Sequence, residues 1–150
     1  MKKFSFPLQF LLDYRKKKED RLKRELAEVI AREEREKSVL RELEEKINLY
    51  REKLREKKQQ EDIKMCWITY LYSYLEKLIR QANEQRKKIR KISEKRGKLQ
   101  EALIQAGQER KAVEKLRERR WADFIYQRGK LEQQILDESA IARFKNKTKP

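Results

Sequence analysis

The chain has 150 residues, 45% of them Asp, Glu, Lys or Arg, and its formal net charge is +16 at pH 7. It contains 3 glycines, 2 prolines, 1 cysteine and no histidine. This composition excludes a large globular core, an internal disulfide and any catalytic site that uses histidine as its base.

A chain with this much charge is either disordered or built of long helices. The spacing of the apolar residues decides between the two, because they recur in steps of three and four, the heptad pattern of a coiled coil. The two prolines lie at positions 7 and 150, so none interrupts the pattern between them. The sequence therefore predicts an all-α protein with long, solvated helices and a thin apolar seam.

The first helix is predicted over about residues 5–56. Pro7 suits its first turn, where the missing N–H has no helical partner to lose. Glu19, Glu33 and Glu36 fall on the seam, and such polar positions cost stability but help to fix register. The predicted seam of this helix is Leu8, Leu12, Arg15, Glu19, Leu22, Leu26, Val29, Glu33, Glu36, Leu40, Leu43, Ile47, Tyr50 and Leu54.

A bend is predicted over about residues 57–64, where the seam fails at Lys57, Glu61 and Lys64. No glycine or proline marks it.

The second helix is predicted over about residues 65–143, followed by a frayed polar tail over 144–150. Tyr70, Tyr72 and Tyr74 alternate as in a strand, but the helical spacing of the neighbouring apolar residues favours a helix. Its predicted seam is Ile68, Leu71, Leu75, Leu78, Ala82, Gln85, Ile89, Ile92, Arg96, Leu99, Leu103, Ala106, Arg110 and Val113.

Folding the two seams antiparallel about position 61 brings apolar residues opposite apolar residues. The weak stretches also largely coincide, since Glu33 and Glu36 meet Gln85 and Ile89. The sequence thus predicts a single antiparallel two-helix coiled-coil hairpin. Its predicted apolar pairs are Ile47 with Leu75, Leu43 with Leu78, Leu40 with Ala82, Val29 with Ile92, Leu22 with Leu99, and Leu8 with Val113.

The second helix is predicted to continue past the end of its partner, over about residues 114–143, here called the overhang. Its apolar stripe is expected to have nothing in the same chain to pack on, which is typical of a surface that docks on another molecule. Arg117, Arg119 and Arg120 lie beside the stripe and would meet acidic groups of a partner. The stripe comprises Trp121, Phe124, Ile125, Leu131, Ile135 and Leu136.

Several functions are excluded or disfavoured by the same sequence. There is no glycine-rich phosphate loop after a strand and no nucleophile with a histidine base, so we expect no enzyme and no cofactor. The apolar run over residues 4–12 differs from a secretory signal, because it is short, contains Pro7 and Gln9, and meets charge at once. A lone cysteine suits a reducing cytosol.

Nucleic-acid binding is the rival function, because residues 86–91 and 117–121 are basic. A basic-region dimer needs a basic helix that feeds a parallel zipper. Here acids intervene throughout and the predicted pairing is antiparallel, so specific nucleic-acid binding is disfavoured. The alternatives are a basic nucleic-acid-binding coiled coil, a generic structural coiled coil, and a membrane-surface helix that uses the overhang.

Four segments in order resemble the FliJ family of flagellar export proteins. They are FPLQFLLDYR at residues 6–15, YLYSYLEKLIRQ at 70–81, EKLRERR at 114–120 and LDESA at 136–140. Together they cover nearly the whole chain.

The resemblance implies a cytosolic, non-enzymatic part of the flagellar type III export apparatus. Members of this family form an antiparallel coiled-coil hairpin similar to the central stalk of rotary ATPases. They associate with the hexameric export ATPase and the membrane-embedded export gate, and some engage export chaperones. The implied location is the cytoplasmic side of the inner membrane at the flagellar base, with peripheral membrane association through these partners.

The resemblance also implies a gate-binding surface near the bend, although Lys46 stands where the family can have an aromatic residue. Trp67, Tyr70, Tyr72 and Tyr74 are expected to face outward beside it. The candidate gate-binding residues are Leu43, Tyr50, Trp67, Tyr70, Leu71, Tyr72, Tyr74, Leu75, Leu78 and Ala82, and the candidate ATPase-binding residues are Arg117, Arg119, Arg120, Trp121, Phe124, Leu131 and Ile135.

Overall fold

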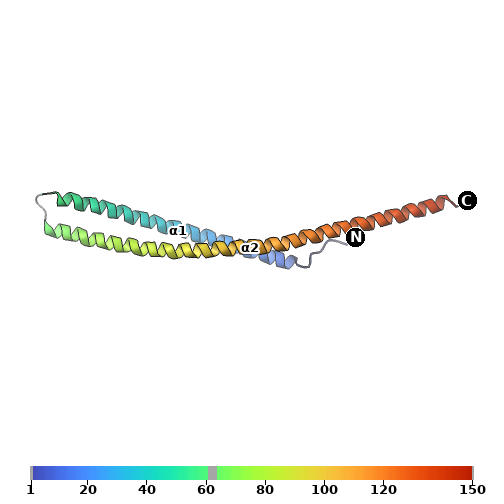
Figure 1. Cartoon of the computed structure of the whole chain (residues 1–150), viewed down its shortest axis with the longest axis horizontal. Coiled ribbons are helices and arrows are strands. Elements are labelled where there is room, and N and C mark those ends of the chain that lie inside the picture. The colour runs from blue at the N-terminus through green and yellow to red at the C-terminus, as the bar shows by residue number, and fades with distance from the viewer. Residues whose placement is uncertain (1, 61–63, 150) are drawn as a thin grey trace. The chain divides into compact units, whose positions relative to one another are not determined.

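The computed structural model of the chain describes residues 2–60 and 64–149. Helix α1 spans Gln9–Lys58 (50 residues) and helix α2 spans Met65–Lys147 (83 residues), and there is no strand in the described ranges. The two helices pack against each other as a hairpin (Figure 1). The prediction of an all-α antiparallel hairpin is confirmed.

The hairpin divides into two compact units, and each takes a segment from both helices. The terminal unit comprises Met1–Asp20 and Ile104–Pro150, and the bend unit comprises Arg21–Leu103. Figure 1 shows the two helices of the bend unit side by side and running in opposite directions. Each candidate docking surface lies within one of these units, so each is described by itself.

The helix ends differ from those expected. α1 begins at Gln9 rather than near residue 5, because the residue before a proline avoids the helical region and Phe6 precedes Pro7. The amide of Gln9 instead closes a turn on the Phe6 carbonyl at 3.0 Å. α2 continues to Lys147 rather than ending near 143, because no helix breaker occurs before Pro150. The predicted bend over about residues 57–64 includes residues 61–63, which lie outside the described residues, while α1 ends at Lys58 and α2 begins at Met65.

The core of the bend unit is a narrow apolar stripe between the helices, and part of it forms one cluster. Ile47, Leu75, Leu78 and Ala82 are buried, with Ala82 0% exposed. The predicted partners Ile47 and Leu75 lie in this cluster, as do Leu43 and Leu78. Full burial of one such aliphatic side chain contributes about 1.5–3 kcal/mol. The residues partly buried against the cluster are Leu40, Leu43, Tyr50, Tyr74 and Ile79.

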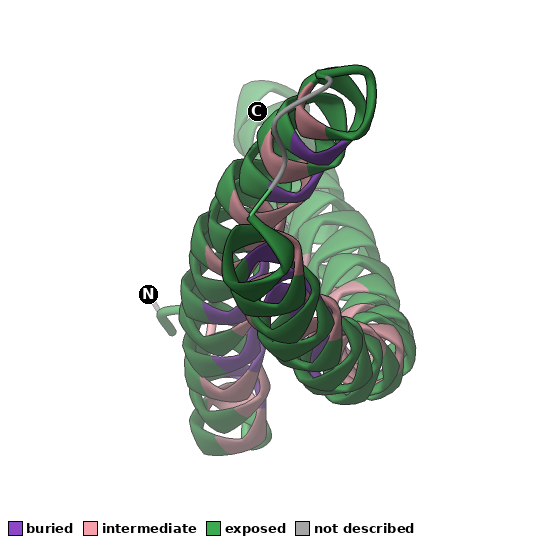
Figure 2. Cartoon of the chain, turned by 90° about the vertical axis from the view of Figure 1, so that its left-hand side faces the viewer, coloured by how far each residue is buried: buried purple, intermediate pink, exposed green. Residues whose placement is uncertain are grey.

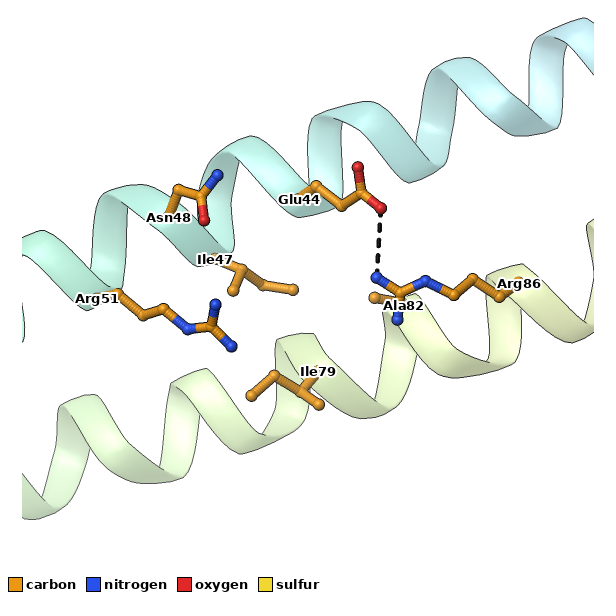
Figure 3. A pocket seen from close by; sticks show the side chains of 7 residues that line it. All are labelled: Glu44, Ile47, Asn48, Arg51, Ile79, Ala82 and Arg86. Atoms are coloured by element: carbon orange, nitrogen blue, oxygen red, sulfur yellow. Dashed lines mark hydrogen bonds and ion pairs between the residues drawn. The ribbon is translucent and has the colours of Figure 1, made fainter.

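Only one side of each helix takes part in this packing. Figure 2 shows the buried residues as separate bands on each helix, with exposed residues over most of the remaining surface. Figure 3 shows how charged residues flank the cluster, where Arg86 donates to Glu44 at 3.2 Å beside Ile47 and Ala82. A shallow hollow of about 280 Å³ opens between the helices there, lined also by Arg51.

A buried ion pair crosses the seam of the bend unit. Glu33 is 3% exposed, and its carboxylate accepts a hydrogen bond from Arg96 at 2.6 Å and pairs with Lys37 at 3.2 Å. The Nε of Arg96 is buried and has no hydrogen-bond partner among the described residues. A buried carboxylate requires such a partner, so this pair ties the register of the helices to one position.

The seam of the terminal unit contains a similar polar cluster. Glu19, 8% exposed, accepts from Arg110, which also donates to Glu114 at 2.7 Å. The hydrogen bonds that Arg110 donates to Glu19 and then to Glu114 raise the pKa of its guanidinium, so it stays charged. Arg15 donates to Glu109 nearby. Charge pairing therefore takes the place of apolar packing at these seam positions.

Glu36 makes a pH-dependent contact in the bend unit. Gln85 donates to its carboxylate and to its backbone carbonyl, and Lys88 lies 2.9 Å away. The hydrogen bond from Gln85, followed by that from Lys88, lowers the pKa of Glu36 below its ordinary value of 4.5. Because the folded-state pKa is depressed, this contribution is present above the ordinary value and is lost as the pH falls through the folded-state pKa.

The cluster geometry predicts a crosslink within one chain. With Cys66 replaced by Ser, the variant Leu43→Cys/Leu78→Cys should form a disulfide on mild oxidation, because both positions lie in the same cluster. Electrophoresis without reductant should show a faster monomer band. The control pair Leu43→Cys/Lys77→Cys, in which Lys77 lies on the exposed side, should stay reduced. Crosslinks that form between chains instead would contradict the hairpin.

The buried ion pair of Arg96 with Glu33 predicts that replacing Arg96 lowers stability more than replacing an arginine in an exposed pair. Arg96→Ala leaves the buried Glu33 carboxylate without its closest partner and should lower the free energy of unfolding by about 2 kcal/mol. The control Arg86→Ala removes the exposed pair with Glu44 and should cost less than about 1 kcal/mol. Urea unfolding followed by circular dichroism measures both. Equal losses of unfolding free energy would show that the buried pair of Arg96 with Glu33 stabilises the fold no more than the exposed pair of Arg86 with Glu44.

Candidate protein-docking surfaces

An aromatic cluster lies on one flank of the bend unit. Trp67, Tyr70 and Tyr74 are spaced by three and four residues on α2, which places them on one side of the helix. Trp67 contacts Tyr70 edge to face at 6.5 Å between ring centroids, and Tyr70 stacks on Tyr74 at 6.5 Å. Tyr74 then packs on Tyr50 of α1 at 4.6 Å. The rings form a continuous row that crosses from one helix to the other.

Lysines of α1 cover part of these rings. The Nζ atoms of Lys53 and Lys57 each lie 5.0 Å from a ring centroid, over Tyr50 and Trp67 respectively. Lys58 lies 5.0 Å from the Tyr72 centroid and also donates to the Tyr72 hydroxyl. Each exposed cation–π contact contributes about 0.5–1 kcal/mol. The result is a surface that is both aromatic and basic.

The structure separates the bend-end candidates by exposure. Leu71, Leu75, Leu78 and Ala82 are buried in the seam, whereas Leu43 and Tyr50 are partly buried against it. Tyr74, expected to face outward, is partly buried because its ring packs on Tyr50. The candidates that present an exposed side chain are Trp67 at 52%, Tyr70 at 60% and Tyr72 at 41%. A hollow of about 360 Å³ lies beside Cys66, Trp67 and Tyr70.

The overhang has a partner in the same chain, which the sequence reasoning missed. Phe4 contacts Trp121 edge to face at 5.0 Å and Phe124 at 5.5 Å between centroids. The guanidinium of Arg117 lies 6.0 Å from the Phe4 ring. The expectation that Trp121 and Phe124 have nothing to pack on is therefore wrong. The physical reason is that residues 2–6 precede α1 as non-helical chain and lie against α2.

Beyond these rings the apolar stripe is open. Leu131 is 59% exposed and Ile135 is 55% exposed, and every described residue from 125 onward is exposed. A hollow of about 550 Å³ lies along this stretch. It is lined by Lys2, Phe124, Gln127, Arg128, Leu131, Glu132 and Ile135.

The arginines beside the overhang stripe are available to a partner. Arg117, Arg119 and Arg120 are exposed, and none of the three makes an ion pair with a residue in the described ranges. Further along, Arg128 donates to Glu132 at 3.3 Å. The terminal unit thus also presents aromatic and aliphatic side chains next to positive charge, a composition typical of interface anchors.

Two kinds of site are absent from the part of the chain that the structure describes. Across residues 2–60 and 64–149, no group of three or more His, Cys, Asp or Glu side chains is placed to hold a metal ion. Within the same ranges, neither helix has a stretch that is apolar and long enough to cross a membrane.

The comparison with protein families gives a match over almost the entire chain. The family model described as "Flagellar FliJ protein" matches residues 4–149. No curated protein and no solved structure gives a significant match. Because the family match extends over both units and both candidate surfaces, the chain belongs to the flagellar FliJ family and is a protein related to flagellar export.

Proposed function

We propose that this protein is a non-enzymatic, stalk-like component of the flagellar export apparatus that binds the hexameric export ATPase and the export gate. The terminal unit would bind the ATPase, and the bend unit would bind the gate. Export chaperones are further candidate partners, and these contacts would hold the protein at the cytoplasmic side of the membrane. The observation that carries the proposal is the presence of an exposed aromatic and basic surface in each unit of a flagellar export family member.

The packing of the seam supports gate binding by exposed residues of the bend unit. In the bend unit, the helices use their buried stripe for each other, so a partner that leaves the hairpin closed must contact residues outside it. Trp67, Tyr70 and Tyr72 meet that requirement, and their rings combine large contact area with a polar edge. We therefore place the direct gate contacts at these three residues. Leu71, Leu75, Leu78 and Ala82 would support them from the core, and Leu43, Tyr50 and Tyr74 would do so from its margin.

The terminal unit supports ATPase binding by two different contributions. Trp121, Phe124, Leu131 and Ile135 supply apolar area, and truncation of such anchors typically costs about 2 kcal/mol or more of binding free energy. Arg117, Arg119 and Arg120 supply positive charge at the edge, which accelerates and orients encounter with an acidic surface. The aliphatic and aromatic residues would thus hold the complex together, and the arginines would speed its formation.

Binding to the gate should depend on the exposed rings of the bend unit. Trp67→Ala/Tyr72→Ala should weaken binding to the purified cytosolic part of the export gate by about tenfold or more, with little change in helicity or melting temperature. Tyr74→Ala should instead lower the melting temperature, because that ring packs on the core cluster. Trp121→Ala serves as the control that leaves gate affinity unchanged. A loss of folding in Trp67→Ala/Tyr72→Ala would assign these rings to the core.

Binding to the ATPase should depend on the overhang. Trp121→Ala/Phe124→Ala should weaken binding to the purified export ATPase by about 2 kcal/mol or more in calorimetry, while the hairpin stays folded. Arg119→Glu/Arg120→Glu should slow association, and this effect should fade at high salt because exposed charges are screened. Trp67→Ala is the matched control from the bend unit. Unchanged affinity of the double alanine variant would remove the overhang from the proposed interface.

A further inference from the structure

The contact between residues 2–6, here called the arm, and the overhang leads to an inference about regulation. Within the arm, Phe6 is 8% exposed and Phe4 is only partly buried. Phe4 rests on Trp121 and Phe124, two residues that the proposed function assigns to the ATPase interface. In the free protein, then, part of the proposed interface is covered by the protein itself.

The arm is held by its rings rather than by its backbone. Among the hydrogen bonds of the described residues, none involves a donor or acceptor of residues 2–5, and the first is the Phe6 carbonyl that accepts from Gln9. Phe6 and the fixed φ of Pro7 anchor the base of the arm. Phe4 lies two residues before that anchor. Its ring can therefore leave Trp121 without breaking a hydrogen bond or unfolding α1.

The charge of the arm is poorly matched to the surface that it covers. Lys2 and Lys3 are both exposed and bring positive charge to a helix that already presents Arg117, Arg119 and Arg120. Lys2 lines the hollow next to Phe124 and Leu131. Glu132 also lines this hollow, but over residues 117–132 the five basic residues outnumber Glu118, Asp123 and Glu132. The net positive charge disfavours the contact with the arm, whereas a partner segment with carboxylates would be favoured. The ring geometry is thus favourable while the electrostatics favour replacement.

We propose that Trp121, Phe124 and Arg117 form an acceptor site for an aromatic side chain, occupied by Phe4 in the free protein and by a ring of an acidic partner segment in the complex. The proposal rests on the proposed function, since the partner is taken to be the export ATPase. Edge-to-face contact with Trp121 and a guanidinium beside the ring define what the site accepts. The arm then acts as a displaceable cover that lowers the apparent affinity of the free protein.

The intramolecular half is tested without any partner. In a Trp67→Phe background, Trp121 is the single tryptophan, because the chain has 2. Phe4→Ala should shift its emission to longer wavelength and raise its acrylamide quenching constant, and Phe4→Leu should give an intermediate change. Phe10→Ala, which removes an N-terminal ring that is 84% exposed, is the matched control and should change neither. Equal quenching in Phe4→Ala and the parent would overturn the proposal.

The partner half is tested by titrating the same variants with the purified ATPase. The apparent affinity equals the intrinsic affinity multiplied by the fraction of molecules in which the site is uncovered. Because Phe4→Ala leaves the site uncovered, it should tighten binding about threefold to tenfold. Phe10→Ala should leave it unchanged. Weaker binding of Phe4→Ala would make Phe4 part of the interface, and unchanged binding would mean that the arm covers nothing that the partner uses; either result overturns the proposal.

The same data separate this proposal from the proposed function. If Trp121→Ala/Phe124→Ala binds the ATPase as well as the parent, the proposed ATPase interface fails and the partner half of the inference fails with it. The quenching experiment would still decide whether Phe4 covers Trp121. If the double variant loses affinity while Phe4→Ala gains none, the proposed interface stands and the cover is refuted.

Discussion

A pair of helices can bury only one stripe of each helix, and this limit determines which side chains remain outside the core. In the bend unit the buried apolar residues lie along a narrow stripe between the helices, where Ile47, Leu75, Leu78 and Ala82 form one cluster. The described residues of this unit form no second layer into which further large side chains could fold. Every additional aromatic residue must therefore lie at the edge of the seam or in solvent. A sequence that places many rings on such a scaffold commits them to contacts outside its own core.

Aromatic residues that are close in the sequence differ in role because they lie at different distances from the seam. Tyr74 lies close enough to the seam to pack on Tyr50, whereas Tyr72 and Trp67 contact lysine side chains and remain largely exposed. The lysine contacts hold the rings in place and cover only part of them. A surface that is already ordered loses less conformational entropy when a partner binds. The cation–π pairs thus contribute to preorganisation more than to the stability of the fold.

Much of the fold follows from the sequence because heptad spacing is a local and redundant signal. The antiparallel hairpin, and the shared cluster of Ile47 with Leu75 and of Leu43 with Leu78, follow from it. The contact of Phe4 with Trp121 does not, because it joins a non-helical segment to a distant helix and obeys no period. The sequence did contain one indication of this contact, because an aromatic residue before Pro7 has no position in the seam and must pack elsewhere or stay exposed. The resemblance to the family rests on short motifs along the chain, because neither the apolar periodicity nor the charge could indicate a family.

The polar seam positions have a consequence for how the two helices can slide. Glu19 and Glu33 are 14 residues apart (33 − 19), and so are their partners Arg96 and Arg110 (110 − 96). Shifting α2 by two heptads would bring Glu33 to Arg110 but set Glu19 opposite Phe124; the opposite shift would bring Glu19 to Arg96 but set Glu33 opposite Ala82. Either way one carboxylate would lose its arginine. The two ion pairs therefore oppose sliding of one helix along the other by two heptads. They do so without using the outer faces of the helices.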